Sequence, residues 1–155
     1  MKKIVITFGI LLAVTILMSG SAVAPWIIDA SLSIDCENVN DAVGAPDNSF
    51  ATAGTNPSTL GTLVLDFGVT NAMPPSTTFT VYGGSTENES YGVEIKSIGN
   101  TTDAVLGIGW DGADYHFTTP STPGIYWQWV LITGATGQTS FEDPIYGPEI
   151  DAVGY

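Results

Sequence analysis

Positively charged side chains are almost absent from this sequence. Its 155 residues contain three lysines and no arginine against 16 Asp and Glu, so the formal net charge is −13. Two of the lysines precede a long apolar run near the start, which leaves Lys96 as the only cation in the rest of the chain. Proteins bind nucleic acids and anionic membrane surfaces largely through Lys and Arg. The sequence therefore excludes both kinds of partner.

Histidine and cysteine are scarce as well, with one residue of each. A Ser-His-Asp or Cys-His arrangement needs a histidine base, and nothing around His116 marks it as one. One His and one Cys cannot form a zinc cluster, and neither Gly-x-Ser-x-Gly nor His-Glu-x-x-His occurs. Paired carboxylates can hydrolyse glycosides, but neighbouring acids on loops are usually only solvated. The candidate pairs are Asp111 with Asp114 and Glu142 with Asp143, and we expect neither to be catalytic, so the sequence predicts no enzymatic activity.

The single cysteine lies at the end of an alternating segment. Apolar residues at positions 30, 32, 34 and 36 alternate with polar residues at 31, 33 and 35. This period of two predicts a strand over Asp29–Cys36 with Cys36 on its buried face. We expect Cys36 to be a small core residue rather than a thiolate nucleophile. A lone cysteine also excludes an intrachain disulfide.

Residues 1–24 have the features of a secretion signal. Two lysines are followed by an apolar run over residues 4–18 and then by small residues ending in Ala22-Val23-Ala24. The sequence thus predicts an extracellular or cell-surface protein with one domain over residues 25–155. An uncleaved anchor is the alternative, because no charge interrupts the chain between Ile4 and Ile28. Any membrane contact would come through this segment alone.

Short alternating segments bounded by Gly, Pro, Asn and Ser recur after residue 24. They predict strands, and helical periodicity is absent apart from a possible turn near Asn40–Val43. The fold class is therefore all-β, and about eight strands suit an antiparallel jelly-roll β-sandwich. We expect loops, which often carry binding sites, over residues 47–58, 71–76, 83–90 and 134–148. The expected strands cover residues 29–36, 60–67, 77–82, 91–98, 104–110, 115–118, 125–133 and 150–155.

Four segments resemble the discoidin-like, or galactose-binding-like, β-sandwich domains. They are Asn40–Asp47, Leu63–Gly68, Thr78–Tyr82 and Gly147–Val153. The resemblance covers roughly residues 30–155. It implies a jelly roll that serves mainly as a surface for holding a ligand, and it does not name that ligand.

The segment Asn40–Asp47 offers oxygen ligands for a divalent cation. Calcium takes about six to eight oxygen ligands, typically carboxylates and carbonyls of an irregular loop, and Asp41 and Asp47 supply two carboxylates. In domains to which this chain is similar, an early loop and a late glutamate share a structural calcium ion, and Glu149 matches that glutamate. We therefore expect Ca²⁺ bound by Asp47, Glu149 and Asp41, relieving part of the negative charge. The alternative is that Asp47 closes an Asx-turn and Glu149 is solvated.

Two loops combine aromatic and acidic side chains in a way that suits carbohydrate. In modules similar to this one, aromatic platforms cover the apolar face of a pyranose while a few polar groups bond its hydroxyls. Relatives often add Arg, which this chain lacks. Trp127 and Trp129 are expected to pack against the sheet, whereas Trp110 fits a core residue and a ligand platform about equally. The candidate ligand-binding residues are Trp110, Asp111, Asp114, Tyr115, Phe141 and Tyr146.

These features predict a non-catalytic binding module, secreted or displayed at the surface, for a neutral glycan or surface glycoprotein. The alternative is a self-associating structural protein of a cell envelope or extracellular filament, with which the few charges and Thr-rich strands are compatible. A hydrolase is the third possibility. Asn88 and Asn100 lie in Asn-x-Ser/Thr sequons and would suit glycosylation of an exported protein.

Overall fold

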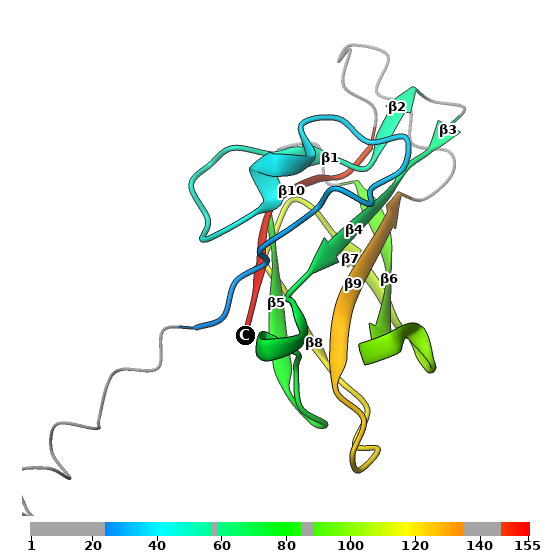
Figure 1. Cartoon of the computed structure of the whole chain (residues 1–155). Helices are drawn as coiled ribbons and strands as arrows, with labels where there is room; N and C mark the ends of the chain where they lie inside the picture. Colours follow the sequence, from blue (N-terminus) through cyan, green and yellow to red (C-terminus); the bar gives the residue numbers. More distant parts are fainter. Residues whose placement is uncertain (1–23, 57–58, 85–88, 135–146) are drawn as a thin grey trace, which may run out of the picture.

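The chain folds into two antiparallel sheets of four strands each (Figure 1). The computed structural model describes residues 24–56, 59–84, 89–134 and 147–155. No helix within these ranges is long and apolar enough to cross a bilayer. The only helical elements described are short 3₁₀ turns, namely η1 (Val39–Ala42), η2 (Val69–Asn71) and η3 (Ile98–Asn100). The predicted all-β fold class is confirmed, and η1 coincides with the turn expected near Asn40–Val43.

The strand order identifies a jelly roll. The first sheet has the order β1 (Ala51–Thr52), β10 (Glu149–Gly154), β5 (Thr78–Gly83) and β8 (Tyr115–Thr118). The second sheet has the order β4 (Thr62–Asp66), β9 (Trp127–Gly134), β6 (Ser90–Ser97) and β7 (Asp103–Trp110). Renumbered from one to eight along the chain, the sheets read 1-8-3-6 and 2-7-4-5. Strand one therefore pairs with eight, two with seven, three with six and four with five. This pairing is that of a jelly roll.

The core lies between the two sheets and follows from strand alternation. Along β6 every second residue is buried, and β4 and β9 bury alternate residues in the same way. These side chains pack against apolar residues from the inner face of the first sheet. The alternating apolar residues of the sequence thus form the core between the two sheets. Fully buried examples from the two sheets are Leu63, Leu65, Tyr91, Ile95, Ile132, Phe79, Val81 and Ile150.

A register shift between β6 and β9 places the two tryptophans of β9 on opposite faces of the sheet. Lys96 pairs with Trp129, but the next residue of β6, Ser97, pairs with Trp127. The extra residue turns Trp127 into the core, where it is 1% exposed, while Trp129 stays on the outer face and is half-buried. Gln128, at the shift, is buried and donates its amide to the Asp66 carboxylate at 2.9 Å. Packing against the sheet is therefore confirmed for Trp127 as a core residue.

The strand predicted over Asp29–Cys36 is wrong. This segment makes only isolated bridges to the edge of β4, at Asp29 and Ile34. Asp29 accepts hydrogen bonds from the backbone N–H and hydroxyl of Ser31, which turns the chain locally and interrupts the alternation. As a result Leu32 and Ile34 are 64% and 63% exposed, and only Ala30 of the expected apolar face is buried.

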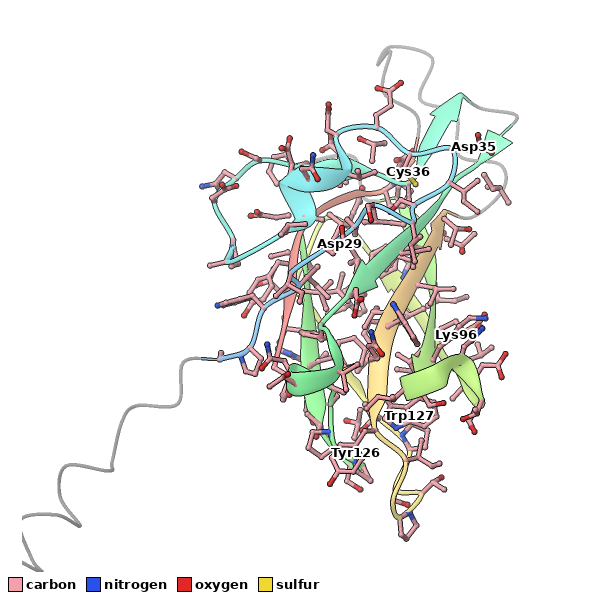
Figure 2. All side chains as sticks on the ribbon, viewed as in Figure 1. Asp29, Asp35, Cys36, Lys96, Tyr126 and Trp127 are labelled. Atoms are coloured by element: carbon pink, nitrogen blue, oxygen red, sulfur yellow. The ribbon has the colours of Figure 1, made fainter. Side chains whose placement is uncertain are left out.

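Cys36 is half-buried rather than enclosed in a strand face (Figure 2). It packs against the core, and its Sγ donates to the carbonyl of Ile34 at 3.2 Å. Burial raises the pKa of the thiol to about 11, and the neighbouring Asp35 carboxylate adds to this effect. The thiol is therefore neutral near pH 7, as expected for a packing residue.

The other predicted strands lie close to observed ones, with shifts of one or two residues at their ends. The segment 60–67 is divided between β3 (Thr59–Leu60) and β4. The loop expected over 47–58 contains two short strands, β1 and β2 (Gly54–Asn56), and β2 pairs with β3 as a separate ribbon. Two- and three-residue strands rich in Thr, Gly and Asn carry no visible periodicity, which is why the sequence did not indicate them.

Candidate functional site

The outer side of the second sheet is where apolar and polar side chains gather without a covering layer among the described residues; we call it the open face. Cross-strand pairing arranges it in rows. One row joins Val105, Glu94, Leu131 and Val64, and the next joins Asp103, Lys96, Trp129 and Asp66. A third row joins Ile108, Gly92, Thr133 and Thr62. Val105 is 81% and Ile108 65% exposed, so this face is unusually apolar for a solvated sheet surface.

The larger hollow on the open face has a volume of about 270 Å³. Trp129 and Leu131 line it from β9, and Val64 lines it from β4. The segment beside β4 adds Leu32, because Ser33 accepts the backbone N–H of Val64 and holds that segment against the strand. The remaining lining residues are Lys96 of β6 and Asn100 of η3. One side of the hollow is thus aromatic and aliphatic, while its rim carries an ammonium and an amide.

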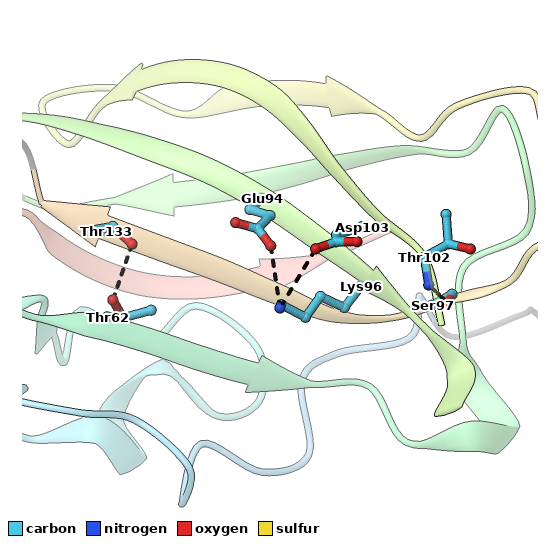
Figure 3. A network of polar contacts seen from close by, with 7 residues as sticks. All are labelled: Thr62, Glu94, Lys96, Ser97, Thr102, Asp103 and Thr133. Atoms are coloured by element: carbon cyan, nitrogen blue, oxygen red, sulfur yellow. Dashed lines mark hydrogen bonds and ion pairs between the residues drawn. The ribbon is translucent and has the colours of Figure 1, made fainter. Parts of the chain in front are cut away.

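Lys96 is held within a small network of charges on this face (Figure 3). Its Nζ lies 3.4 Å from Oε1 of Glu94 and 4.0 Å from Oδ2 of Asp103. Both acids neighbour Lys96, since Glu94 is two residues earlier on β6 and Asp103 is its cross-strand partner on β7. Two carboxylates around one ammonium leave the group with a net negative charge. The hollow therefore offers donors and acceptors together rather than a positive site.

A smaller hollow of about 150 Å³ lies on the same face. It is lined by Gly92, Val93 and Glu94 of β6, by Val105 of β7 and by Thr133 of β9. The hydroxyl of Thr133 lies 3.2 Å from that of Thr62, as Figure 3 also shows. The absence of a side chain at Gly92 opens this hollow, and a Cβ there would meet nothing closer than the Thr133 carbonyl at 4.0 Å.

The residues predicted from the loop after β7 differ in their burial. Trp110 is 40% exposed, and Asp114 is exposed as well. Tyr115 is half-buried, with its ring 6.5 Å from that of Phe117. Asp111 is 0% exposed, and its carboxylate accepts the backbone N–H groups of Glu89 at 2.6 Å and of Glu149 at 3.0 Å. The candidate ligand residues Phe141 and Tyr146 lie outside the described residues.

Asp111 therefore ties three parts of the chain together at one end of the sandwich. The loop after β7 is joined to the start of β6 through Glu89 and to the start of β10 through Glu149. The nearby Tyr91 is fully buried, and burial followed by the Asp111 charge raises the pKa of its phenol. The Tyr91 phenol is therefore neutral near pH 7.

The expected calcium ligands lie on adjoining elements. Asp41 and Asp47 are exposed, and Glu149 at the start of β10 is half-buried. The loop and β10 are joined directly, because the buried Asp151 carboxylate accepts the backbone N–H groups of Asp47 at 2.9 Å and Asn48 at 3.1 Å. No group of three or more His, Cys, Asp or Glu side chains placed to hold a metal ion occurs among the described residues.

Asp47 also forms the Asx-turn named above as the alternative to a calcium ligand. Its Oδ1 accepts the backbone N–H of Ser49 at 2.9 Å. This bond occupies one carboxylate oxygen and leaves the calcium expectation untested.

Asn100, the last residue of η3, is exposed and lines the larger hollow. Its backbone has a positive φ of 54°. Asn88, the other sequon asparagine, lies outside the described residues.

Sequence reasoning missed the residues of the open face. Trp129 was expected to pack against the sheet, and Lys96 was noted only as the one cation after the apolar run. The alternation along β9 could have indicated them, because residues 129, 131 and 133 lie on the face opposite to the buried residues 130 and 132. Leu32 and Asn100 come from other elements, so their position at the hollow depends on tertiary structure.

Comparisons with known proteins support the fold. No protein-family model matches the chain, and no curated protein matches it. A solved structure of a GH29 fucosidase mutant from Ruminococcus gnavus, in complex with fucose, matches 74% of this chain at a TM-score of 0.50 and 17% identity. The match covers 21% of that protein, so this chain spans about a fifth of its length. The likeness supports the β-sandwich implied by the discoidin-like resemblance, and membership of the discoidin-like family stays a prediction.

Proposed function

We propose that this protein is a non-catalytic carbohydrate-binding module, secreted or displayed at the cell surface, that holds a neutral glycan on its open face. The observation that carries the proposal is the hollow of about 270 Å³ lined by Trp129. Ligand sites are typically concave, mostly apolar and rimmed by a few polar groups. The larger hollow has this composition, with Leu131 and Val64 beside the indole and Lys96 and Asn100 at the rim.

A sugar ring suits this hollow because it is amphipathic. Its C–H groups form an apolar face that an indole can cover, while its hydroxyls both donate and accept hydrogen bonds. The Lys96 ammonium donates, the Glu94 carboxylate accepts, and the two are 3.4 Å apart. An amide such as that of Asn100 can do both. Carbohydrate is therefore the ligand class whose chemistry matches both the wall and the rim.

Charge favours a neutral glycan over an acidic one. Lys96 is already flanked by the carboxylates of Glu94 and Asp103. The whole chain has a formal net charge of −13, so a uronic or sialic acid would approach a negative surface. Neutral hexoses and deoxyhexoses meet no such repulsion. The fold likeness to a fucosidase in complex with fucose is compatible with a glycan ligand, although it does not identify the sugar.

The proposed module includes a structural calcium ion near Asp47, Glu149 and Asp41. The excess of acidic side chains and the adjacency of the loop to β10 support this part of the proposal. We place the protein outside the cell on the basis of its first 24 residues. Asn100 belongs to the proposed sugar-binding rim, with glycosylation of its side chain as a competing use of the same residue.

A neutral-glycan array read with purified protein tests the proposed function. Trp129→Ala is expected to remove the signals, because it deletes the aromatic wall of the larger hollow, while the melting temperature shows whether the variant folds. Trp110→Ala is the matched control, since Trp110 is exposed at the far end of the same sheet. Loss of binding in Trp110→Ala with retention in Trp129→Ala would place the site at the loop after β7 and contradict our proposal.

Self-association is a second candidate function, favoured by the exposed apolar side chains of β7. This strand is an edge of its sheet, and Val105, Ile108 and Trp110 are 81%, 65% and 40% exposed. Unprotected apolar edges invite pairing with another chain. Light scattering as a function of protein concentration would show growth of the particle mass, and Ile108→Lys would abolish it. A constant monomer mass at all concentrations would exclude this function.

A further inference from the structure

The two hollows of the open face adjoin one another along β6. The larger is bordered by Lys96, and the smaller by Glu94 and Gly92. These three residues point to the same side of the strand at intervals of two. Lys96 and Gly92 are thus separated by about 13 Å at the rise of a β-strand. Opposite them on β9 lie Trp129, Leu131 and Thr133, which pair with Lys96, Glu94 and Gly92 without a register shift.

The sizes of the hollows suit one sugar unit each. Pockets that enclose a drug-sized ligand typically measure roughly 300–1,000 Å³. The hollows here measure about 270 and 150 Å³, both below that range. Neither can enclose an oligosaccharide, but a chain lying along β6 can place successive rings in the two hollows.

From this arrangement we infer that the open face is an extended site with two subsites, and that it recognises adjoining units of a neutral oligosaccharide rather than a single terminal sugar. This inference rests on the proposed function. The larger hollow is the primary subsite, because its Trp129 wall covers the apolar face of one ring. The smaller hollow is the secondary subsite, where the Thr133 hydroxyl and Glu94 carboxylate bond the hydroxyls of the next unit.

Glu94 is the residue that joins the two subsites. Its carboxylate pairs with Lys96 at the larger hollow, and the residue itself lines the smaller one. Its side chain is 36% exposed and that of Lys96 27%, so both are partly open to a ligand. The pair therefore lies where two linked sugar units would meet.

Gly92 allows the secondary subsite to be blocked without disturbing the fold. Its Cβ position points into the smaller hollow, where the nearest atom would be 4.0 Å away. Gly92→Val therefore fills the hollow, and valine is well suited to a strand. A second variant, Val105→Lys, changes the other wall of the hollow at a residue that is 81% exposed and thus free of core contacts.

Calorimetric titrations with neutral gluco-, manno-, galacto-, xylo- and fuco-oligosaccharides of one to four units test the inference. For the series that binds, we expect the affinity of the wild-type protein to rise at least about tenfold between one and three units. Gly92→Val and Val105→Lys should keep monosaccharide binding within about twofold and lose that rise. Trp129→Ala should lose binding of every length.

The outcomes separate the inference from the proposed function. If one and four units bind with equal affinity, or if both subsite variants keep the rise, the two-subsite inference is wrong while the proposed function stands. If no member of any series binds, the proposed function fails together with the inference.

Discussion

Asp111 shows how much one buried carboxylate can organise in a chain with few ion pairs. It lies in a Trp-Asp-Gly loop that the sequence marked as a sugar-binding candidate. In the structure its two oxygens accept the backbone N–H groups of Glu89 and Glu149. Backbone donors replace the missing lysines and arginines as partners of the acid. A sequence carries no record of such long-range backbone contacts, which is why this role was not predictable.

Replacing Asp111 with asparagine should destabilise the protein by about 2 kcal/mol, because hydrogen bonds to a charged group are worth about 1.5–3 kcal/mol. The side-chain NH₂ of asparagine would face one of the two backbone N–H groups, so one of the two hydrogen bonds would be lost. Urea unfolding followed by circular dichroism measures the change. Asp114→Asn is the control, since Asp114 is exposed and should change the stability by less than about 0.5 kcal/mol. Equal effects of the two substitutions would contradict the role given to Asp111.

The thiol of Cys36 gives a prediction about reactivity and pH. Burial raises its pKa from 9.0 to about 11, so folding favours the neutral thiol. Its contribution to stability is complete below about pH 9 and is lost as the pH rises toward 11. Alkylation by iodoacetamide at pH 8 should be at least about tenfold slower in the folded protein than in guanidinium chloride, because only the thiolate reacts. Equal rates would show that the thiol is neither buried nor shifted.

The two tryptophans of β9 mark the limit of residue-level prediction. A regular strand would put Trp127 and Trp129 on one face, since they are two residues apart. The shift at Ser97 sends Trp127 into the core and leaves Trp129 at the larger hollow. Whether a strand contains such an irregularity depends on its neighbour, so the alternating pattern alone could not separate a core residue from a ligand platform.

At the scale of elements, alternation was sufficient wherever a strand has one buried and one outer face. Tyr115–Thr118 was predicted with the observed bounds, and the other long strands were placed within one or two residues. It failed for Asp29–Cys36, whose polar turn at Ser31 breaks the period while the composition stays strand-like. That segment instead lies beside β4 and contributes Leu32 to the larger hollow.

The junction between the loop ending at Asn48 and β10 is built by Asp151. Asp151 is 7% exposed, and its carboxylate accepts the backbone N–H groups of Asp47 and Asn48. Asp151→Asn should therefore cost about 2 kcal/mol in the free energy of unfolding, whether or not a metal ion is present. Urea unfolding in buffer containing EDTA measures this. A change smaller than about 0.5 kcal/mol would show that the junction does not depend on this carboxylate.

Calcium binding at the same junction is a separate prediction. EDTA should lower the melting temperature and added Ca²⁺ should restore it, because an ion that binds only the folded state stabilises it. Asp47→Asn and Glu149→Gln should each reduce this response, while Asp103→Asn, on the opposite sheet, should leave it unchanged. An unchanged melting temperature in EDTA would remove calcium from the account.

At the scale of the whole molecule, composition and periodicity were enough for the fold class but not for the site. A β-sandwich follows from many short strands and an apolar inner face, both of which are local properties of the sequence, whereas the jelly-roll strand order comes from long-range pairing. The open face is assembled from four strands, the segment around Leu32 and the turn at Asn100. No single segment of the sequence contains these residues. The candidate ligand residues predicted from the sequence were instead neighbours in one loop, such as Trp110 and Asp111.

The scarcity of positive charge in this molecule also affects the open face. The one cation of the described chain lies at the larger hollow, and two carboxylates flank it. This arrangement is consistent with a surface that avoids acidic ligands and holds neutral ones through stacking and hydroxyl contacts. We therefore propose both the class of ligand and the face of the molecule that holds it.

Nuclear magnetic resonance titration of ¹⁵N-labelled protein tests both the ligand class and the position of the site. The ligand is the neutral oligosaccharide that gives the strongest signal on the array. We predict that the amide shifts that change cluster on β6 and β9, at Lys96, Trp129 and Thr133, with the Asn100 side-chain amide among them. Changes confined to residues 110–115, or no change with any neutral oligosaccharide, would contradict the account.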